Sequence, residues 1–337
     1  MKKITKAVIP VAGLGTRFLP ITKSVPKEML PIVDKPTLSY IIDECIESGI
    51  TDILLITSPY KKVIEDYFDQ NFELQHRLEQ KDKIKELELL NTKPEDINIY
   101  FIRQGEPKGS GHAIKLAKTF VGEDDFAVLY GDDLMKAEVP ALKQLIELHD
   151  QTSANIIGAL EVPKELSSKY GMIEFKNKST KEINTIIEKP SIEESPSNYA
   201  GLGRYIVSAK IFPILEALSL GVGNEYQFTD AMKKLMENEQ FYACLLNAKY
   251  YDTGSKIGYL KANIDYALEN KELNKELKDY LNEDFNSFFL LLKFQEQCAT
   301  YKIAPTSATF APAKYPIGNF FLEIILVNYS VIELPSI

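Results

Sequence analysis

A glycine-rich segment near the start of the chain is followed closely by two cations. The sequence GLGTRFLP, residues 13–20, comes directly after the apolar run Ala7 to Val11, and Lys27 follows Arg17 in PKEMLP. Glycines let backbone amides approach a polyphosphate closely, and an arginine with a lysine can bind phosphate oxygens. The segment matches neither a Walker loop nor the three-glycine dinucleotide fingerprint. It is typical of phosphate binding, but a strand-to-helix turn with surface cations has the same composition.

Aspartates occur at the ends of two other segments. Asp132 and Asp133, in GDD, follow the apolar run Phe126 to Tyr130, and Asp252 lies in YYDTGSK. Mg²⁺ prefers one or two carboxylates together with phosphate oxygens and water. A carboxylate at the end of the apolar strand, such as Asp132, therefore suits a metal-bound polyphosphate, and Asp252 is a separate candidate for a second ligand. Asp133 ranks below both. Aspartates before Gly or Thr also cap turns, which is the alternative for each residue taken alone.

Two more strand ends carry polar residues that suit ligand binding. Gln104 and GEPKGSGHA, residues 105–113, come at an expected strand-to-helix junction, where ligands meet α/β sheets. A side-chain amide offers both a donor and an acceptor, as a pyrimidine edge requires. In EKP, residues 188–190, a carboxylate stands beside an ammonium, a pair suited to sugar hydroxyls and a phosphate. Ordinary turns contain the same residue types.

The histidines and cysteines argue against other chemistry. They are few, far apart, and lack the spacing of a zinc site or a disulfide framework. The sequence therefore predicts no catalytic histidine, no histidine-bound metal and a reducing cytoplasmic setting. The residues are His76, His112, His149, Cys45, Cys244 and Cys298.

Apolar β-branched runs alternate with helix-period segments in the first half of the chain. The run Phe126 to Tyr130 is continuously apolar, which is typical of parallel strands covered on both faces. In residues 37–48 apolar side chains recur every three or four positions, which predicts an amphipathic helix ending at Gly49. Residues 61–90 are rich in charge, so we expect solvated helices inserted between two strands. After Asn155 shorter strands predict an antiparallel extension.

The pattern predicts an α/β fold with a Rossmann-like mixed, mainly parallel sheet, helices on both faces and an antiparallel extension. The first strand is expected at Ala7 to Val11, so the N-terminal segment is not interpreted as a signal peptide. The expected remaining strands are 53–57, 99–102, 126–130, 156–162, 172–175, 183–188 and 202–207, and the later helices are 228–237 and 257–269.

Charge and size narrow the class of protein. The chain has 337 residues, 45% of them hydrophobic, so it can bury a large core. Its formal charge is −9, from 48 acidic and 39 basic residues, and it has no dense run of Lys and Arg. Nucleic acid is therefore not an expected partner.

The C-terminal segment differs in composition from the rest. Residues 285–337 contain only six charged residues and have apolar clusters at 288–292 and 320–327. This change predicts a catalytic domain over 1–284 and an apolar tail of uncertain role over 285–337. A membrane anchor needs about 20 apolar residues, and Glu323 interrupts the longest run. Packing or contact between subunits is the expected role, with no membrane partner.

The block from Gly13 to Pro36, including PKEML and LPIVDKP, resembles the sugar-phosphate nucleotidylyltransferase family. The resemblance extends from Lys3 to Glu269. The insertion at 61–90 and EYQFTDA, residues 225–231, resemble the bacterial members that use UTP and glucose 1-phosphate. The implied reaction transfers a uridylyl group from UTP to glucose 1-phosphate with Mg²⁺ as cofactor, in a homodimer or homotetramer.

The resemblance also assigns roles to individual residues. Catalysis falls to Arg17, Lys27, Asp132 and Lys189, and the metal to Asp132 and Asp252. Nucleotide contacts are implied at Ala12, Gly13, Gly15, Gln104, Gly109 and Gly111. Sugar-phosphate contacts are implied at Tyr170, Gly171, Glu188, Lys189 and Gly203.

One departure from the family pattern weakens the assignment of the base. Ser110 stands where the family usually has leucine, with Lys108 before it. Transfer from dTTP to the same sugar phosphate therefore stays open as an alternative. A regulatory subunit that binds sugar nucleotides without catalysis is a second alternative, although it would be expected to lose Arg17, Lys27 or Asp132.

Overall fold

The computed structural model describes residues 3–90, 93–94 and 96–283. The chain divides into two compact units, residues 1–264 and 265–337. Of the second unit the structure describes 265–283, which includes a helix at 274–283. The predicted tail, 285–337, lies outside the described residues, and the predicted domain boundary before it stays a prediction.

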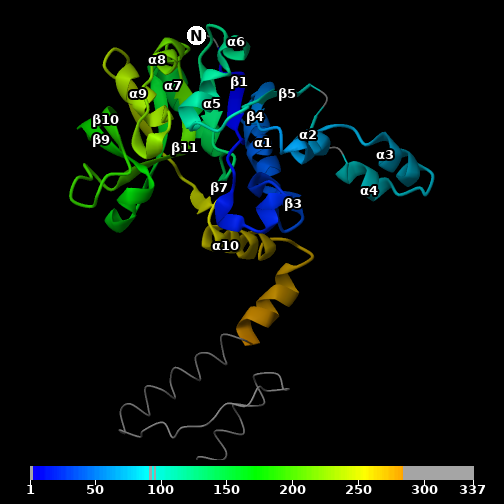
Figure 1. Cartoon of the computed structure of the whole chain (residues 1–337). Helices are drawn as coiled ribbons and strands as arrows, with labels where there is room; N and C mark the ends of the chain where they lie inside the picture. The colour runs from blue at the N-terminus through cyan, green and yellow to red at the C-terminus, as the bar shows by residue number, and fades with distance from the viewer. Residues whose placement is uncertain (1–2, 91–92, 95, 284–337) are drawn as a thin grey trace, which may run out of the picture. The chain divides into compact units, whose positions relative to one another are not determined.

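A nine-stranded mixed sheet forms the centre of the first unit, in the order β5-β4-β1-β6-β11-β8-β12-β10-β9 (Figure 1). The strands are β1 (Lys6–Pro10), β4 (Asp52–Thr57), β5 (Asn98–Arg103), β6 (Phe126–Leu129), β8 (Asn155–Glu161), β9 (Gly171–Asn177), β10 (Glu182–Glu188), β11 (Tyr199–Val207) and β12 (Phe241–Leu245).

Parallel pairing is less extensive than expected. Strands β5, β4, β1 and β6 are parallel to one another, with Val8 opposite Leu54 and Val128. From β6 onward the ladders are antiparallel, except for β12, which pairs parallel to β8. The sheet is thus mixed, as predicted, but "mainly parallel" is not what the ladders show. The reason is β11, which runs antiparallel to both β6 and β8, together with the antiparallel pair β9 and β10. The sequence pattern also missed β12, which inserts between β8 and β10.

Helices cover both faces of the sheet, as the continuous apolar strands predicted. On β1, Ala7 and Ile9 pack into one cluster with α1 (Thr37–Glu47) and α7 (Ala141–Thr152). Val8 faces the opposite cluster, with α5 (Ser110–Lys115), α8 (Ile211–Glu216) and α9 (Phe228–Leu235). Because successive side chains of a strand point to opposite faces, one strand serves both cores. The short α6 (Lys118–Val121) also packs on the second face through Val121.

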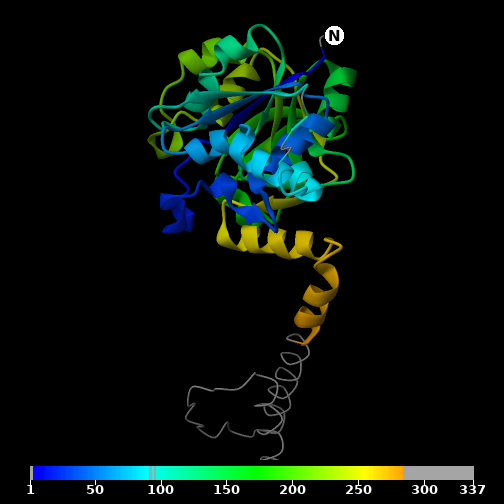
Figure 2. The same ribbon diagram turned by 90° about the vertical axis from the view of Figure 1, so that its right-hand side faces the viewer.

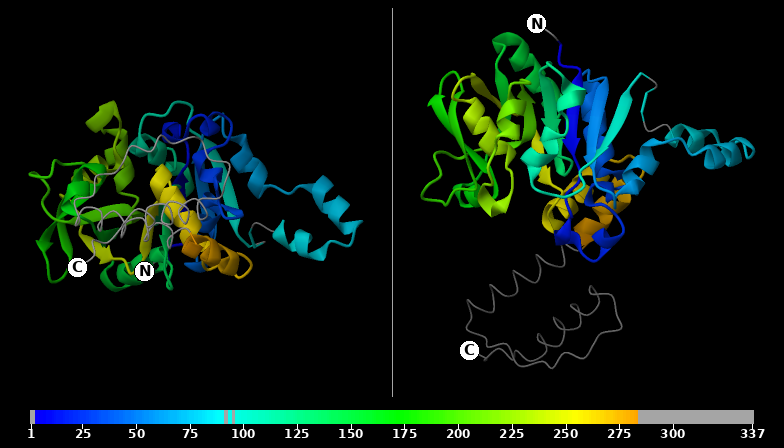
Figure 3. Two further views of the ribbon diagram at one scale, coloured as in Figure 1. Left: turned by 90° about the horizontal axis from the view of Figure 1, so that it is seen from below. Right: turned by 45° about the horizontal axis from the view of Figure 1, so that its top comes forward.

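The charge-rich insertion is helical, as expected. It forms α2 (Lys62–Phe68), α3 (Phe72–Glu79) and α4 (Ile84–Leu89). Figures 1 and 3 show α3 and α4 extending from the β5 edge of the sheet, and Figure 2 views them from their free end. We call α3 and α4 the exposed arm. The buried residues of the two apolar clusters include none from this arm, whereas α2 contributes Ile64 and Phe68 to one of them.

Two short ribbons complete the described structure at the carboxyl ends of the central strands. β7 (Asp133–Lys136) pairs with β13 (Lys249–Asp252), and β2 (Pro31–Ile32) pairs with β3 (Lys35–Pro36). The last helix, α10, is Lys256–Ala267. None of the helices in the described part of the chain is long and apolar enough to cross a membrane.

Candidate active site

The glycine-rich loop folds around Lys27. Gly15 has a φ of 65° and begins a 3₁₀ turn at Thr16–Phe18, a conformation that suits glycine. The Thr22 hydroxyl donates a hydrogen bond of 2.9 Å to the Gly15 carbonyl. A methyl group on Gly15 would lie 3.4 Å from Cβ of Lys27. The loop after β1 therefore carries Lys27 beside its own backbone, as the spacing of the motif suggested.

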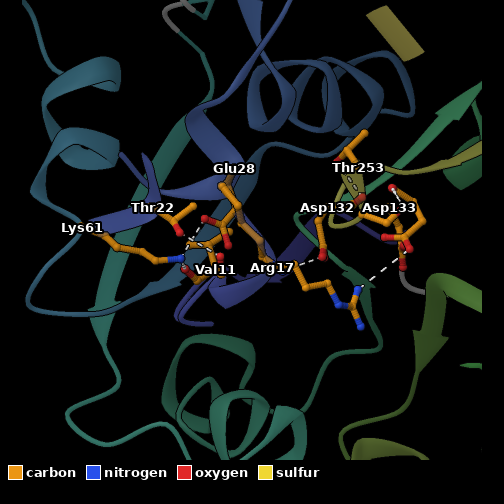
Figure 4. Close-up of polar contacts among 12 residues, drawn as sticks. Val11, Arg17, Thr22, Glu28, Lys61, Asp132, Asp133 and Thr253 are labelled. Carbon is orange, nitrogen blue, oxygen red and sulfur yellow. Dashed lines mark hydrogen bonds and ion pairs between the residues drawn. The ribbon is translucent and has the colours of Figure 1, made fainter. Parts of the chain in front are cut away.

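Lys27 and Arg17 each reach an aspartate from a distant part of the chain. The Lys27 ammonium lies 2.5 Å from Oδ2 of Asp132, and the Arg17 guanidinium lies 4.0 Å from Oδ2 of Asp252. Arg17 is 70% exposed, whereas Lys27 is 19% exposed. Figure 4 draws Arg17 and Asp132 among the polar contacts of the site. Two cations of the loop and two carboxylates thus converge at one place.

Asp132 and Asp252 are brought together by the β7–β13 ribbon. Asp252 pairs in register with Asp133, the neighbour of Asp132. Thr253 donates two hydrogen bonds to the Asp132 carbonyl, from its amide at 2.9 Å and its hydroxyl at 2.7 Å. A methyl group on Gly254 would lie 2.4 Å from Oδ2 of Asp132 and 3.1 Å from Oδ1 of Asp252. Both carboxylates therefore border the same small space, which only a glycine leaves open.

The charges at this point stabilise one another. Burial alone would raise the pKa of Asp132, but the charge and hydrogen bond of Lys27, a backbone hydrogen bond and the charge of Arg17 together lower that pKa. Burial likewise opposes the charge on Lys27, but Asp132 and Glu28 raise the pKa of Lys27. Asp132 is therefore an ionised carboxylate at neutral pH, which is the form that binds a metal ion.

This pair of carboxylates suits Mg²⁺. Among the described residues no group of three or more His, Cys, Asp or Glu side chains could hold a metal ion. Proteins nevertheless usually bind Mg²⁺ through only one or two carboxylates, and the ion takes its other ligands from phosphates and water. The ionised state of Asp132 and its closeness to Asp252 meet that requirement.

Asp133 belongs to a second hydrogen-bond network, next to the pair of Asp132 and Asp252. Its Oδ1 accepts a 2.6 Å hydrogen bond from the Tyr250 hydroxyl, and its carbonyl accepts one of 2.8 Å from Arg204. Arg204 is fully buried and holds Glu44 through two hydrogen bonds of 2.9 and 2.8 Å. Burial, with the nearby charge of Asp132, raises the pKa of Asp133 to about 7. Asp133 thus connects the β7–β13 ribbon to Arg204 and Tyr250.

A buried ion pair lies behind the glycine loop. The Lys61 ammonium donates to the Val11 carbonyl at 2.6 Å and to Oε2 of Glu28 at 2.7 Å (Figure 4). The side chains of Lys61 and Glu28 are only 8% and 2% exposed. The sequence placed Lys61 at the start of a solvated excursion, and this was wrong for that residue. It ties the end of β1 to the segment that carries Lys27.

The predicted base-binding residues form a separate cluster. Gln104 directly follows β5, is 3% exposed, and its Nε2 lies 2.7 Å from Nδ1 of His112. The Gly111 amide donates to the Tyr226 carbonyl at 2.8 Å. Gly109 has a φ of 99°, and a methyl group there would lie 2.6 Å from the same carbonyl. The structure thus locks the glycine turn onto the segment before α9.

Ser110, which stands where the family usually has leucine, makes hydrogen bonds that leucine cannot make. Its hydroxyl accepts a 3.1 Å hydrogen bond from the Phe228 amide and also bonds with Tyr130 at the end of β6. Lys108 is paired with Glu106 at 2.7 Å, at the surface. Ser110 therefore connects the glycine turn to α9 and β6, a structural role that leucine cannot fill in the same way.

The predicted sugar-phosphate residues meet at the ends of β9 and β10. Glu188 lies opposite Gly171 in the ladder, and the Lys189 amide donates to the Tyr170 carbonyl at 3.0 Å. The Lys189 ammonium lies 3.3 Å from Oε1 of Glu188 and is 46% exposed. Lys189 has a φ of 47°, a backbone angle that residues other than glycine rarely adopt. Backbone strain of this kind persists where the surroundings impose it and is frequent at functional sites.

This sugar cluster connects directly to the aspartates. The Tyr170 ring packs edge-on against Tyr250, whose hydroxyl donates to Asp133. Gly203 has a φ of 50°, and a methyl group on it would lie 2.1 Å from Oδ2 of Asp133. The fold therefore brings the predicted sugar-phosphate residues close to Asp133, the neighbour of Asp132. These residues are Tyr170, Gly171, Glu188, Lys189 and Gly203.

Four contributors were missed by the sequence analysis. Lys61 lies in a charge-rich stretch, whereas Tyr250 begins YYDTGSK and Arg204 follows Gly203. All three were missed because their partners are far away in the chain. His112 was considered only as one of the scattered histidines. The GSGH sequence offers no signal for its contact with Gln104, because that contact depends on how β5 and α5 pack.

The chain is similar to known proteins over most of its length. A model of the family described as nucleotidyl transferase matches residues 6–269. The UTP–glucose-1-phosphate uridylyltransferase of Staphylococcus epidermidis is 45% identical over 285 residues, 84% of this chain and 99% of that protein. The structure of a UTP-bound UGPase from Acinetobacter baumannii matches with 40% identity and a TM-score of 0.77, over 83% of this chain and 99% of that one. A UDP-glucose pyrophosphorylase complexed with UDP-glucose matches with 36% identity and a TM-score of 0.71, over 79% and 100%.

Proposed function

The chain belongs to the nucleotidyl transferase family, and we propose that it transfers a uridylyl group from UTP to glucose 1-phosphate. The products are UDP-glucose and pyrophosphate. The relative that is 45% identical carries this activity in its name, and two of the similar structures are named for bound UTP and bound UDP-glucose.

One observation carries the proposal for this chain. Lys27 and Arg17, from the glycine loop, converge on Asp132 and Asp252 at the carboxyl ends of the strands. Ligands of open α/β sheets bind at that edge. Cations and metal-binding carboxylates side by side are what a reaction between two phosphate groups requires.

The reaction is a direct in-line displacement. An oxygen of the sugar 1-phosphate attacks the α-phosphorus of UTP and forms the new P–O bond. The bond from that phosphorus to the bridging oxygen breaks, and its electron pair leaves with pyrophosphate. The attacking phosphate has a second pKa of about 6 and is already ionised at neutral pH. No general base and no covalent enzyme intermediate are needed, which agrees with the scattered histidines and cysteines.

The protein aligns two anions that repel each other. Arg17 and Lys27 bind the triphosphate, with Ala12, Gly13 and Gly15 offering backbone amides from the loop. Lys189 binds the sugar phosphate. Holding both groups in one geometry replaces a bimolecular encounter by an oriented reaction, and fixed positive charge offsets the charge that develops.

Asp132 and Asp252 hold Mg²⁺ in this proposal. When bound, the ion supplies charge neutralisation at the phosphate oxygens. The remaining steps belong to the chain. Asp132 is kept ionised by Lys27, and Thr253 holds the Asp132 backbone in place.

The substrates are distinguished at the two other clusters. Gln104 contacts the uracil edge, with Gly109 and Gly111 forming the floor beneath the base. Glu188 binds sugar hydroxyls, and Tyr170, Gly171 and Gly203 line the hexose. These assignments are supported by the burial of Gln104 and by the links from Tyr170 through Tyr250 to Asp133.

A pyrophosphate-release assay tests the function. The purified chain should be incubated with Mg²⁺ and a matrix of nucleoside triphosphates and sugar 1-phosphates. UTP with glucose 1-phosphate should give the highest rate. A higher rate with dTTP would replace the proposal by thymidylyl transfer, and no release with any pair would favour a non-catalytic, regulatory role.

Assembly and location complete the proposal. The enzyme acts as a homodimer or homotetramer in the cytoplasm, where Cys45 and Cys244, both free thiols, stay reduced. The apolar composition of segment 285–337 supports the proposal that it serves packing or contact between subunits. Truncation after Asp284 followed by size-exclusion chromatography tests this, and an unchanged oligomer would exclude a role for the tail.

A further inference from the structure

Helix α10 contacts both segments that carry the proposed phosphate-binding cations. The Tyr259 ring packs edge-on against Phe18, the neighbour of Arg17, with 5.6 Å between the ring centroids. The Tyr259 hydroxyl donates a 2.8 Å hydrogen bond to the Pro31 carbonyl, a short distance along the chain from Lys27. In Figures 1 and 2 the helix, drawn in yellow, lies against these blue N-terminal segments. One side chain thus connects two stretches of the chain that each hold a cation.

The same helix is joined directly to Asp252. It begins at Lys256, and the Asp252 carbonyl accepts hydrogen bonds from the amide and the hydroxyl of Ser255, at 3.1 and 3.0 Å. A methyl group on Gly258 would clash with that carbonyl, so the first turn of α10 packs closely on it. The position of Tyr259 is therefore fixed relative to the second proposed metal ligand.

One turn further along α10, Asn263 holds a strained residue. Val33, in the turn between β2 and β3, has a φ of 63°. β-branched residues are outliers at such angles, and tight hairpin turns usually place glycine or asparagine there. The Val33 amide donates a 2.9 Å hydrogen bond to Oδ1 of Asn263, whose Nδ2 donates to the Tyr259 carbonyl at 3.1 Å. A backbone amide only donates and a backbone carbonyl only accepts, so these two partners fix the orientation of the Asn263 side chain.

The strained turn lies close to Lys27 in the chain. The 3₁₀ turn that begins at Lys27 is followed by the short strand β2, and Val33 comes next. A displacement of Val33 therefore reaches the Lys27 backbone across a few residues. Backbone strain persists only where the surroundings impose it, and it clusters at functional sites. By accepting the hydrogen bond of the Val33 amide, Asn263 helps to impose this conformation.

We propose that Tyr259 and Asn263 are positioning residues, which fix Arg17 and Lys27 relative to each other and to Asp252. The inference rests on the proposed function, in which the two cations bind the triphosphate of UTP. Arg17 is 70% exposed and lies 4.0 Å from Asp252, so the placement of this long side chain depends on its backbone. Fixed placement matters because a reaction between two phosphates gains its rate from alignment and from charge that is already in position.

Two replacements of Tyr259 separate its hydroxyl from its ring. Tyr259→Phe removes the hydrogen bond to Pro31 and keeps the packing on Phe18, whereas Tyr259→Leu removes both. We expect the KM for UTP to rise about threefold in Tyr259→Phe, the effect of one neutral hydrogen bond. It should rise about tenfold in Tyr259→Leu, which also loses the aromatic pair. The KM for glucose 1-phosphate should stay within about twofold of the wild-type value, because the phosphate of that substrate is proposed to bind Lys189.

A rescue experiment tests the role of Asn263. Asn263→Ala removes the acceptor of the Val33 amide and should raise the KM for UTP about three- to tenfold, because the valine is then free to leave its strained angle. Glycine adopts a φ of 63° without strain. The double variant Asn263→Ala with Val33→Gly should therefore recover most of the loss, and Val33→Gly alone should stay within about twofold of the wild type. A general loss of structure in Asn263→Ala would not be relieved by removing a second side chain.

Binding without turnover separates positioning from a general loss of structure. The dissociation constants of UTP and UMP should be measured by calorimetry with Mg²⁺ and without glucose 1-phosphate. In Tyr259→Leu and Asn263→Ala the constant for UTP should rise by the same factor as KM. The constant for UMP should stay within about twofold of the wild-type value, since UMP lacks the β- and γ-phosphates that the two cations are placed to bind.

Tyr100→Phe is the matched control for these measurements. The Tyr100 hydroxyl also makes a surface hydrogen bond, of 3.3 Å to Asp52, but it lies on β5, away from the proposed phosphate-binding loop. This variant should keep the wild-type KM for UTP and both dissociation constants.

The outcomes distinguish the two proposals. A wild-type enzyme that releases no pyrophosphate from UTP and glucose 1-phosphate would refute the proposed function itself. If the wild type is active but Tyr259→Leu and Asn263→Ala use and bind UTP normally, the positioning role is overturned. Equal weakening of UTP and UMP would show that α10 only supports the fold, and a lack of rescue by Val33→Gly would overturn the role of Asn263.

Discussion

The Lys27 ammonium lies 2.5 Å from Oδ2 of Asp132, although 105 residues separate them in the chain. Each group stabilises the charge of the other, since Asp132 raises the pKa of Lys27 and Lys27 lowers the pKa of Asp132. The lysine that is proposed to bind phosphate thus touches the carboxylate that is proposed to bind the metal. The phosphate site and the metal site are therefore one electrostatic unit.

Replacing Asp132 by asparagine should abolish magnesium-dependent turnover. The variant keeps the shape of the side chain but removes the charge that a metal ion and Lys27 both require. We expect kcat to fall about a thousandfold, as for the loss of a main electrostatic group. Pyrophosphate release at increasing Mg²⁺ concentrations measures the effect. Asp69→Asn, at the exposed end of α2, is the control and should keep full activity.

Several predicted site residues could be placed at strand ends from the sequence, because the strands before them were easy to recognise. The run Phe126 to Tyr130 is continuously apolar, so Asp132 could be placed at the carboxyl end of a buried strand. Asp252 was harder, because its closeness to Asp132 depends on the register of the β7–β13 ribbon. Without the family resemblance, these two aspartates would have remained separate candidates.

The features that escaped prediction depend on long-range packing. Lys61 lies in a charge-rich stretch, which favours solvent exposure. It is nevertheless buried, because its ammonium donates hydrogen bonds to Glu28 and to the Val11 carbonyl. Strand β12 was missed because its place in the sheet is set by its pairing with β8, not by local alternation. Buried charges and strand order are properties of the assembled fold.

Lys189→Gly should weaken the use of glucose 1-phosphate without harming the backbone. Glycine accepts the φ of 47° more readily than lysine, so the change removes the ammonium but relieves strain. We expect kcat/KM for glucose 1-phosphate to fall about 10- to 100-fold, the effect of a hydrogen bond to a charged group. Steady-state kinetics with each substrate varied in turn measure this.

A second lysine provides the control for Lys189. Lys181 has a φ of 61° but lies in the turn between β9 and β10, outside the site. Lys181→Gly should leave the kinetics unchanged. If Lys189→Gly also used glucose 1-phosphate normally, Lys189 would not bind the sugar phosphate.

Gly109→Ala should raise the KM for UTP. The φ of 99° disfavours alanine, and the added methyl would lie 2.6 Å from the Tyr226 carbonyl. The glycine turn must then move away from the segment before α9, and the floor of the base site moves with it. Gly122→Ala is the control, since Gly122 also has a positive φ, of 67°, but no neighbour within 4 Å of the added methyl. Equal KM values for UTP in both variants would show that the Gly109 turn does not form the floor of the base site.

The buried pair of Glu28 and Lys61 gives a prediction about stability and pH. Lys61→Met leaves the Glu28 carboxylate buried without its partner, which costs about 3–5 kcal/mol of unfolding free energy when the acid is charged. Burial already raises the pKa of Glu28, and Lys61 is the main group that opposes this. In Lys61→Met the pKa of Glu28 should therefore rise further above its value of 4.5 in the unfolded chain.

The sign of the pH dependence follows from that rise. A carboxyl group whose pKa is higher in the folded state contributes its full stability below the unfolded pKa and loses it as the pH rises through the folded pKa. Lys61→Met should accordingly be least destabilised near pH 4 to 5 and lose stability as the pH rises to 8. Urea unfolding of the wild type and the variant across this range measures the difference.

The double variant Lys61→Met with Glu28→Gln completes the test. It removes the buried charge, so it should recover part of the lost stability at pH 8 and show a flatter dependence on pH than Lys61→Met. Lys83→Met serves as the control, because its ion pair with Glu86 lies on the exposed arm, and it should unfold like the wild type at every pH. Because Lys61 also holds the Val11 carbonyl before the glycine loop, Lys61→Met should raise the KM for UTP, and the double variant should not restore it. A double variant with normal UTP kinetics would mean that the pair stabilises the fold without positioning the loop.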